Sequence, residues 1–274
     1  MYAEVIGDPV AQSKSPIIHK YWLERLGLEG DYRRTRVVQK DLTRFLTARR
    51  AEPEWRGCNV TIPHKQAIIP LLDRLDADAA AIGAVNCVVP EAGVLVGYNS
   101  DVDGVAVAFD PTALRGKKAV LIGSGGAARA VLAYLAKSGA GRIDIVARSP
   151  DRAEFLRELA PNADVSILPL GPAGLSFDGA AALINASSLG MAGAEPMPQF
   201  LLDAVRSHAA GATIFDLVTT PAETGFLVAG RAAGGHCIDG IAMLVGQASR
   251  AFQLFFGIPA PPPDEALQRF LIAD

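Results

Sequence analysis

The chain has 274 residues, of which half are hydrophobic and a fifth are charged. This composition excludes a disordered chain and is typical of a globular protein with length for one large α/β domain or two modest ones. The net charge of −3 provides no basic surface for nucleic acid or an anionic membrane, so we expect neither as a partner.

The three cysteines, Cys58, Cys87 and Cys237, have no CxxC spacing and no neighbouring histidine cluster, which argues against a zinc site or a disulfide framework. His19 and His64 show no metal-ligand spacing either, so we expect them to be packing or loop residues and no metal to be bound. The opening residues lack the features of a signal peptide, and no segment reaches the ~20 apolar residues of a membrane span. We therefore expect a cytoplasmic protein with reduced thiols.

Strands and helices alternate along the first hundred residues. The patterns predict strands at 2–7, 31–38 and 56–63, and helices at 15–28, 41–50 and 68–83. Pro16 suits the first turn of its helix, and Asp41 is a plausible N-cap for the next. Residues 84–101 predict a hairpin that turns through Glu91, Ala92 and Gly93.

From Gly116 onward the pattern becomes a regular alternation of buried strands and helices. Strands are predicted at 117–123, 142–148, 163–168, 181–187 and 213–218, with helices at 127–140 and 150–160. Strands that are almost continuously apolar predict a parallel, doubly wound α/β sheet covered on both faces. The last 35 residues do not extend this alternation and end in a proline-rich connector, 259–263, and a short helix.

A glycine-rich turn joins the first of these strands to its helix. The residues Gly123, Ser124, Gly125, Gly126 and Ala127, followed by alanine, fit the pattern G-x-G-x-x-A. Glycines there allow a tight turn and a close backbone approach, and the helix N-terminus offers unpaired amides to a pyrophosphate. An ordinary strand–helix turn is the alternative, but the context favours a dinucleotide site, and the missing P-loop lysine excludes ATP cleavage.

The next strand indicates which dinucleotide is bound. An NAD site usually has an acidic residue about 20 residues after the glycines, to hold the ribose 2′-hydroxyl. This strand instead ends at Arg148, followed by Ser149 and Arg152, and guanidinium groups suit a 2′-phosphate. NADP is therefore favoured, although Asp151 keeps NAD open and both arginines could simply be solvated.

Hydroxyl groups lie close to the first predicted helix. Ser13 and Ser15 could hold a small carboxylate beside the helix amides, or one of them could simply cap the helix. Asn59 and Thr61 alternate with an apolar residue and should point to the same side of a strand. Residues of this kind that converge on one site would bind a polyhydroxylated ligand.

Three further polar residues follow apolar segments. Asn86 ends one apolar run, and Asp101 follows the predicted hairpin. Lys65 lies in the stretch VTIPHKQAII, and its amine is either a solvated charge or an acid–base group. These ten residues alone leave both interpretations open.

The ordered set of motifs resembles the shikimate dehydrogenase family over nearly the whole chain. The motifs are GDPVAQSKSP, NVTIPHK, GAVN, NSD, GSGGAARA, ARS, NASSLGM and DGIAMLVGQ. The resemblance implies a substrate domain at 1–101, an NADP-binding Rossmann-like domain at 102–236, and a helical segment, 237–274, that returns to the first domain. It implies reversible NADP-dependent reduction of 3-dehydroshikimate to shikimate, by a monomer or a homodimer.

The resemblance also implies a role for each matching residue. Lys65 and Asp101 would be catalytic, with the lysine giving the proton that a nascent alkoxide needs. The residues that would bind substrate are Ser13, Ser15, Asn59, Thr61, Asn86 and Gln247. The residues that would bind NADP are Gly123, Ser124, Gly125, Gly126, Ala127, Arg148, Ser149, Arg152, Ser187, Leu217, Gly240 and Met243.

One position departs from the family pattern. The family often has tyrosine in the loop that reads DLVTTP here, and this chain has Thr219 in its place. The departure leaves open a paralogue that acts on quinate or an amino-substituted shikimate, and a ligand-binding relative with little activity. The intact Lys65 and Asp101 positions disfavour the last of these.

Overall fold

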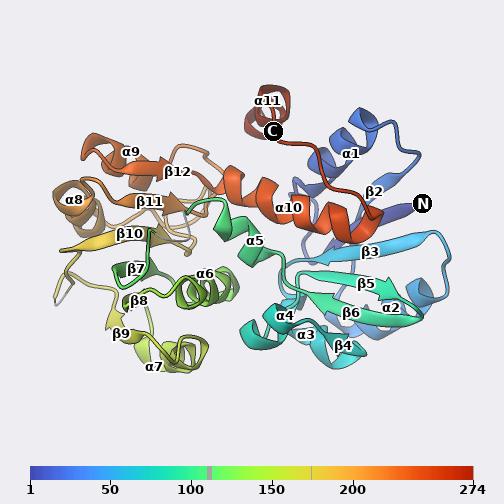
Figure 1. The fold of residues 1–274 in the computed structure, drawn as a ribbon, viewed down its shortest axis with the longest axis horizontal. Helices are drawn as coiled ribbons and strands as arrows, with labels where there is room; N and C mark the ends of the chain where they lie inside the picture. The colour runs from blue at the N-terminus through green and yellow to red at the C-terminus, as the bar shows by residue number, and fades with distance from the viewer. Residues whose placement is uncertain (110–112, 174, 274) are drawn as a thin grey trace. The chain divides into compact units, whose positions relative to one another are not determined.

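The computed structural model describes residues 1–109, 113–173 and 175–273, which fold into two compact units. The first unit contains Met1–Ser100 and the chain from Val245 onward, and the second contains Asp101–Leu244. Figure 1 labels the elements. Within the described residues, no helix combines the length and the apolar character that a membrane crossing would require.

The first unit is built on a six-stranded mixed sheet in the order β2-β1-β3-β5-β6-β4. β1 pairs in parallel with β2 and β3, whereas β5 is antiparallel to both of its neighbours. The strands are β1 (Tyr2–Gly7), β2 (Asp31–Arg36), β3 (Trp55–Val60), β4 (Arg74–Leu75), β5 (Cys87–Glu91) and β6 (Val94–Tyr98). The helices are α1 (Ser15–Arg25), α2 (Leu42–Arg50), α3 (His64–Ala67), α4 (Ala77–Ile82) and α11 (Glu265–Ala273).

The single helix predicted at 68–83 is wrong. The structure has a 3₁₀ turn at Ile69–Leu71, the short strand β4 and then α4. Pro70 lacks the amide hydrogen that a continuous helix would use, and Asp76 restarts the chain as a helix by accepting a bond from the Ala79 amide at 2.8 Å. The hairpin prediction is confirmed, because Ala92 and Gly93 both adopt positive φ between β5 and β6.

Asp41 occupies the predicted N-cap position of α2, but its side chain makes no capping bond. The residue ends a 3₁₀ turn, Gln39–Asp41, and its φ and ψ of −98° and −2° are already helical. A side chain caps best from an extended backbone, so the carboxylate instead pairs with Arg44 at 3.3 Å. The sequence therefore predicted the N-cap position correctly, but it did not predict that the Asp41 side chain would make no capping bond.

Each face of the first sheet has its own apolar cluster. One cluster joins Tyr2, Ile6 and Trp55 to Leu42 and Leu46 of α2. The other cluster includes Ala3, Val5 and Tyr32 together with Ala251 and Phe255 of the last long helix. Successive residues of β1 therefore contribute to opposite faces, as the strand geometry requires.

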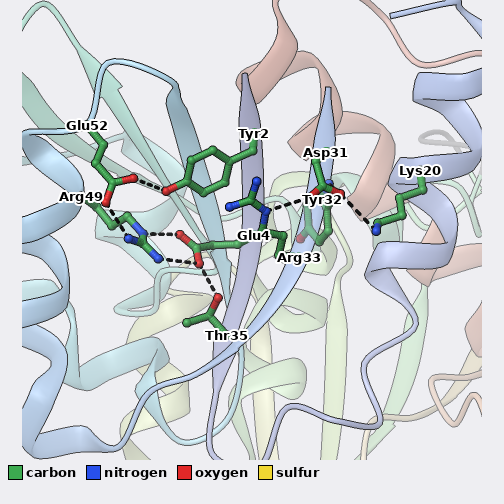
Figure 2. Close-up of polar contacts among 9 residues, drawn as sticks. All are labelled: Tyr2, Glu4, Lys20, Asp31, Tyr32, Arg33, Thr35, Arg49 and Glu52. Carbon is green, nitrogen blue, oxygen red and sulfur yellow. Dashed lines mark hydrogen bonds and ion pairs between the residues drawn. The ribbon is translucent and has the colours of Figure 1, made fainter. Parts of the chain in front are cut away.

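A buried carboxylate interrupts the first of these clusters. Glu4 is fully buried in β1, and its oxygens accept bonds from Arg49 Nε at 2.7 Å and from the Thr35 hydroxyl (Figure 2). Arg49 also pairs with Glu52, whose other oxygen accepts the Tyr2 hydroxyl (Figure 2). The charge of Glu4 is thus matched inside the fold, which a buried carboxylate requires.

The second unit contains a six-stranded sheet in which every pairing is parallel. Its strands are β7 (Lys118–Ile122), β8 (Arg142–Ala147), β9 (Asp164–Pro169), β10 (Ala180–Asn185), β11 (Thr213–Asp216) and β12 (His236–Ile238). Its helices are α5 (Asp101–Ala106), α6 (Gly126–Lys137), α7 (Pro150–Ala153), α8 (Gln199–His208) and α9 (Gly225–Ala232). The boundary between the units falls within α10 (Gly240–Phe256).

The order of this second sheet is β9-β8-β7-β10-β11-β12, so the chain runs outward from β7 and then reverses at β10. This is the doubly wound order of a dinucleotide-binding fold, and it confirms the predicted parallel sheet. Leu201 and Val205 of α8 and Phe226 of α9 cover one face and share a cluster with Val120 and Leu183. The sequence patterns did not predict α8, α9 or β12.

The helix predicted at 150–160 is only partly correct. The first turn is α7, and the chain then continues as a 3₁₀ helix at Glu154–Leu159. Arg157 of this segment donates to the Val165 carbonyl and pairs with Glu154 at 2.7 Å. Tertiary hydrogen bonding to β9 therefore accompanies the tighter geometry.

Candidate active site

The two serines of the first unit lie together at the start of α1. Ser13 Oγ donates to Ser15 Oγ at 3.2 Å and accepts a bond from the Ser15 amide at 3.3 Å. Lys14, and neither serine, occupies the N-cap position of α1. Arg34 on β2 supports the loop by donating to the Ser13 carbonyl at 2.9 Å. The structure therefore presents a pair of adjacent hydroxyls, which could bind a carboxylate.

Asn59 is the penultimate residue of β3, and its side-chain amide forms hydrogen bonds within the protein. Its Oδ1 accepts the Tyr32 hydroxyl at 2.5 Å, and its Nδ2 donates to the Asn86 carbonyl at 3.2 Å and to Cys87 Sγ at 3.0 Å. Burial raises the pKa of the Tyr32 hydroxyl, so this phenol stays protonated and donates. Asn59 thereby connects β2, β3 and β5.

Thr61 lies just beyond β3 and is half-buried. The expectation that Asn59 and Thr61 alternate along one strand holds only to Val60, where β3 ends. The Thr61 amide still donates to the Ile6 carbonyl at 2.9 Å. A Cβ at Gly7 would come within 2.5 Å of the Thr61 methyl group, so glycine permits this close approach.

Lys65 lies on the short helix α3. The preceding His64 is fully buried, and its Nε2 donates to the Val37 carbonyl at 2.6 Å, which anchors this turn. The Lys65 side chain is half-buried, and its carbonyl accepts a bond from the Val85 amide at 2.8 Å. The backbone of the lysine is therefore fixed beside the residue that precedes Asn86.

Ser100 connects two of the predicted substrate residues. Asn86 Oδ1 accepts a bond from the Ser100 amide at 2.7 Å, and Asn86 Nδ2 donates to Ser100 Oγ at 3.1 Å. Ser100 Oγ also lies 3.5 Å from Gln247 Oε1 on α10. All three residues are buried. Sequence reasoning did not single out Ser100, although the NSD motif contains it.

Asp101 follows Ser100 directly and begins α5 in the second unit. The residue is 7% exposed, and a carboxylate in the first turn of a helix is stabilised by the helix dipole. The structure thus places Asn86, Ser100 and Gln247 together, and Asp101 directly follows Ser100 in the chain.

The glycine loop of the second unit lies between β7 and α6. Gly123 has a φ of +115°, and a Cβ there would come within 2.8 Å of the Ala186 carbonyl oxygen. Gly125 is the N-cap of α6 and, like Gly126, would have an open space around an added Cβ. The first amides of α6 have no partner within the helix, and β7 adjoins β10, where the strand order reverses. The loop therefore fits a pyrophosphate group.

The three residues predicted to contact a 2′-phosphate follow β8. Arg148 and Arg152 are exposed, and Ser149 is the N-cap of α7 but makes no capping bond with its side chain. Arg148 Nη1 lies 3.6 Å from Glu195 in an exposed ion pair. Such a pair is weak, so a phosphate could replace the carboxylate as the partner of Arg148.

The remaining residues of the predicted cofactor set lie beyond β10, β11 and β12. Ser187 Oγ donates to Asn185 Oδ1 at 2.6 Å. A Cβ at Gly240 would come within 2.6 Å of the Leu217 carbonyl oxygen, so the N-terminus of α10 packs closely on the chain that leaves β11. Met243 follows on the same helix and is buried. In a parallel sheet these positions share one edge with the glycine loop.

Two features of the described residues bear on the expected chemistry. No group of three or more His, Cys, Asp or Glu residues in these parts of the chain could hold a metal ion. Thr219 is half-buried in the segment between β11 and α9.

Comparisons with known proteins agree with this geometry. Residues 5–88 match the family model for the shikimate dehydrogenase substrate binding domain, and residues 106–188 match the model for shikimate / quinate 5-dehydrogenase. The shikimate dehydrogenase (NADP(+)) of Sphingopyxis alaskensis is 45% identical over 99% of this chain and 97% of its own length.

Solved structures agree on the fold. The shikimate 5-dehydrogenase of Thermus thermophilus, crystallised with NADP(H) and shikimate, is 33% identical and has a TM-score of 0.82, covering 100% of this chain and 98% of its own. A 5-ketofructose reductase of a Gluconobacter strain is 29% identical with a TM-score of 0.87, covering 100% and 98%. The fold therefore occurs in proteins named for different substrates. The two family models and the Sphingopyxis relative, by contrast, are all named for shikimate dehydrogenases. The chain belongs to the shikimate dehydrogenase family.

Proposed function

We propose that this protein is an NADP-dependent shikimate dehydrogenase that interconverts 3-dehydroshikimate and shikimate, as a monomer or a homodimer. The observation that carries the proposal is the 45% identity, over 99% of the chain, to a shikimate dehydrogenase (NADP(+)). Support comes also from the hydroxyl pair of the first unit and the glycine loop of the second. The first unit would bind substrate and the second would bind NADP.

In the first unit, Ser13 and Ser15 bind the substrate carboxylate through their adjacent hydroxyls. Thr61, Asn86 and Gln247 bind the ring hydroxyls. Asn59 acts with them by connecting β2, β3 and β5, since both the oxygen and the nitrogen of its side-chain amide already have partners in the protein. The buried Ser100 links Asn86 to Gln247 and keeps their polar atoms near each other.

The residues at the strand ends of the second unit fit NADP. The glycine loop and the first amides of α6 bind the pyrophosphate, and Arg148, Ser149 and Arg152 bind the 2′-phosphate. Ser187, Leu217, Gly240 and Met243 border the nicotinamide. When bound, NADPH would supply the hydride for the reduction, and NADP⁺ would accept it in the reverse direction.

Lys65 and Asp101 manage the proton of the reaction. As the ketone of 3-dehydroshikimate becomes an alkoxide, Lys65 Nζ donates a proton to its oxygen, and in the reverse direction the amine accepts that proton. Asp101 hydrogen-bonds a substrate hydroxyl.

The decisive experiment is an assay of purified protein for NADPH formation from shikimate and NADP. We expect shikimate-dependent absorbance at 340 nm, a property of the cofactor, and a much slower reaction with NAD. Absence of activity with shikimate and also with quinate would contradict the proposal.

A second candidate is quinate as an additional substrate. Thr219 favours it, because threonine is smaller than the tyrosine that the family often has and leaves room for a further ring substituent. Measuring the rates with shikimate and quinate side by side separates the two candidates. An amino-substituted shikimate belongs in the same comparison, and a relative that binds the ligand without turnover would show binding alone.

A further inference from the structure

Asn185 and Asp216 end neighbouring parallel strands and face each other in register. Both residues are fully buried, and Asn185 Nδ2 donates to Asp216 Oδ1 at 2.9 Å. The same Nδ2 donates to the Leu189 carbonyl at 3.1 Å. The two side chains thus form one polar connection between the carboxyl ends of β10 and β11.

Asn185 also fixes the chain that leaves β10. Its Oδ1 accepts bonds from the Ser187 amide at 3.1 Å and from Ser187 Oγ at 2.6 Å. Ser187 Oγ in turn accepts the Leu189 amide at 3.2 Å. These bonds close the turn at residues 186–189.

Asp216 does the same for the chain that leaves β11. Its Oδ1 accepts the Val218 amide at 3.0 Å, and its Oδ2 accepts the Thr224 hydroxyl at 2.6 Å. Thr224 is the N-cap of α9 and accepts the Leu227 amide at 3.3 Å. One carboxyl group therefore holds both ends of the segment 217–224, which carries Leu217 and Thr219.

We propose that Asp216 is a positioning residue for the nicotinamide end of NADP, acting through Asn185 on segment 186–189 and through Thr224 on segment 217–224. The proposal rests on the proposed function, which places Ser187 and Leu217 beside the nicotinamide. The adenosine end of NADP would contact Arg148 and lies outside the reach of these hydrogen bonds.

The role depends on hydrogen-bond geometry rather than on charge. All three partners of Asp216 are neutral, and burial raises the pKa of its carboxyl to about 6. When protonated, the carboxyl can donate to Thr224, because a hydroxyl both donates and accepts. An asparagine would satisfy the same partners, with its oxygen toward Val218 and its amide nitrogen toward Thr224.

A second buried acid of the same sheet provides a matched control. Asp144 on β8 is 2% exposed and pairs with Lys118 at 3.0 Å and with Arg142 at 2.9 Å. Both cations lie at the first positions of β7 and β8, the end of the sheet opposite the glycine loop. Replacing Asp144 should lower stability without changing the binding or use of NADP.

The test compares Asp216→Ala, Asp216→Asn and Asp144→Asn in the full-length protein. The measurements are kcat and KM with shikimate and NADP, the fluorescence change when NADPH binds, and the dissociation constant of adenosine 2′,5′-bisphosphate, which carries only the adenosine end. For Asp216→Ala we expect kcat to fall at least about tenfold and the NADPH fluorescence change to shrink, because small misplacements slow hydride transfer.

For the same variant, adenosine 2′,5′-bisphosphate should bind within about twofold of wild type, and Asp216→Asn should recover kcat to within about threefold. Asp144→Asn should leave all three measurements close to wild type. If Asp216→Ala does not fold, Thr224→Val tests the same connection, with a smaller loss in kcat and unchanged binding of the bisphosphate.

Equal losses in kcat and in bisphosphate binding would overturn the proposal, because they would indicate general damage. A kcat for Asp216→Ala equal to that of Asp144→Asn would overturn it too. If the proposed function were wrong, the result would differ, because wild type itself would turn over neither shikimate nor quinate. The NADPH fluorescence change would then still report whether Asp216 positions the nicotinamide.

Discussion

The imidazole ring of His19 lies flat against the phenol ring of Tyr32, with ring centroids 4.1 Å apart and planes 6° apart. His19 is fully buried among aromatic rings, and neither of its ring nitrogens has a hydrogen-bond partner within the described residues. The same Tyr32 ring contacts the predicted substrate residues through its hydroxyl, which donates to Asn59.

We predict that His19 makes the protein less stable in mild acid. Burial lowers the pKa of His19 from 6.5 to about 3, so below pH 6.5 the unfolded chain takes up a proton that the folded chain refuses. Stability is therefore fully present above pH 6.5 and falls as the pH drops toward 3. At pH 5 the loss is about 2 kcal/mol, from about 1.5 pH units at 1.36 kcal/mol each.

Urea unfolding of wild type and His19→Phe at pH 7 and pH 5 measures this effect. The stability difference between the two proteins should shift by about 2 kcal/mol in favour of His19→Phe at pH 5. The exposed His236→Phe should show no such shift. A difference independent of pH would contradict the burial argument.

Arg49 is expected to contribute strongly to stability because it pairs with the buried Glu4 (Figure 2). In Arg49→Leu the carboxylate would keep the Thr35 hydroxyl but no arginine partner among the described residues, and removing one partner of a buried pair costs about 3 kcal/mol or more. The neighbouring Arg50 pairs with Asp73 at the surface, so Arg50→Leu should cost less than about 1 kcal/mol. Equal urea midpoints for the two variants would refute this prediction.

Lys65→Ala should lower kcat by a factor on the order of 10² to 10⁴, the usual size of the effect when an acid–base group is removed. The KM for shikimate should change much less, because the hydroxyl pair and Asn86 remain. Steady-state kinetics measure both constants, with the exposed Lys40→Ala as the control. Activity within a few-fold of wild type would remove Lys65 from the catalytic pair.

Arg148→Ala should raise the KM for NADP and leave the use of NAD nearly unchanged, since only NADP carries the 2′-phosphate. A charge-assisted hydrogen bond at an exposed site is worth at most about 1.5 kcal/mol, so its removal corresponds to roughly a tenfold effect on kcat/KM or less. Arg206→Ala, on helix α8 of the same unit, is the control for a change in net charge. Similar kcat/KM values of wild type for both cofactors would contradict the argument.

Thr219→Tyr should increase kcat/KM with shikimate several-fold. The added phenol supplies one neutral hydrogen bond to the ring, worth about 0.5–1.5 kcal/mol, and fills space that a bulkier substrate could use. Activity with quinate should fall at the same time. The control is Thr220→Tyr at the next, exposed position. If Thr219→Tyr changed neither activity, the loop would not touch the ring.

The sequence allowed five of the six strands of the second unit and the helix α6 to be predicted, because these strands are almost continuously apolar and α6 follows a short glycine-rich turn. The stretch 68–83 misled for a local reason: its apolar residues have helical spacing, but Pro70 and Asp76 divide it. The 3₁₀ helix at Glu154–Leu159 comes with a bond from Arg157 to β9, and no local sequence pattern contains that interaction.

For the site, as for the fold, local features could be predicted from the sequence and contacts between distant segments could not. The adjacency of Ser13 and Ser15 and the glycine loop are local in sequence, and the structure has both. The polar connection between Asn185 and Asp216 exists only because two strands became neighbours, 31 residues apart in the chain. Likewise, the hydrogen bond that occupies Asn59 Oδ1 comes from Tyr32 on another strand.

The edge strands of the two sheets, β2, β4, β9 and β12, bear on how readily the protein aggregates. An exposed strand edge can pair with another chain and seed aggregation, and charges, short length or proline prevent it. β2 carries three arginines, and β4 has only two residues. β12 has three residues, and β9 ends at Pro169. Each of the four edges is therefore a poor template for β-pairing, so we expect the folded protein to resist aggregation through its edges at high concentration.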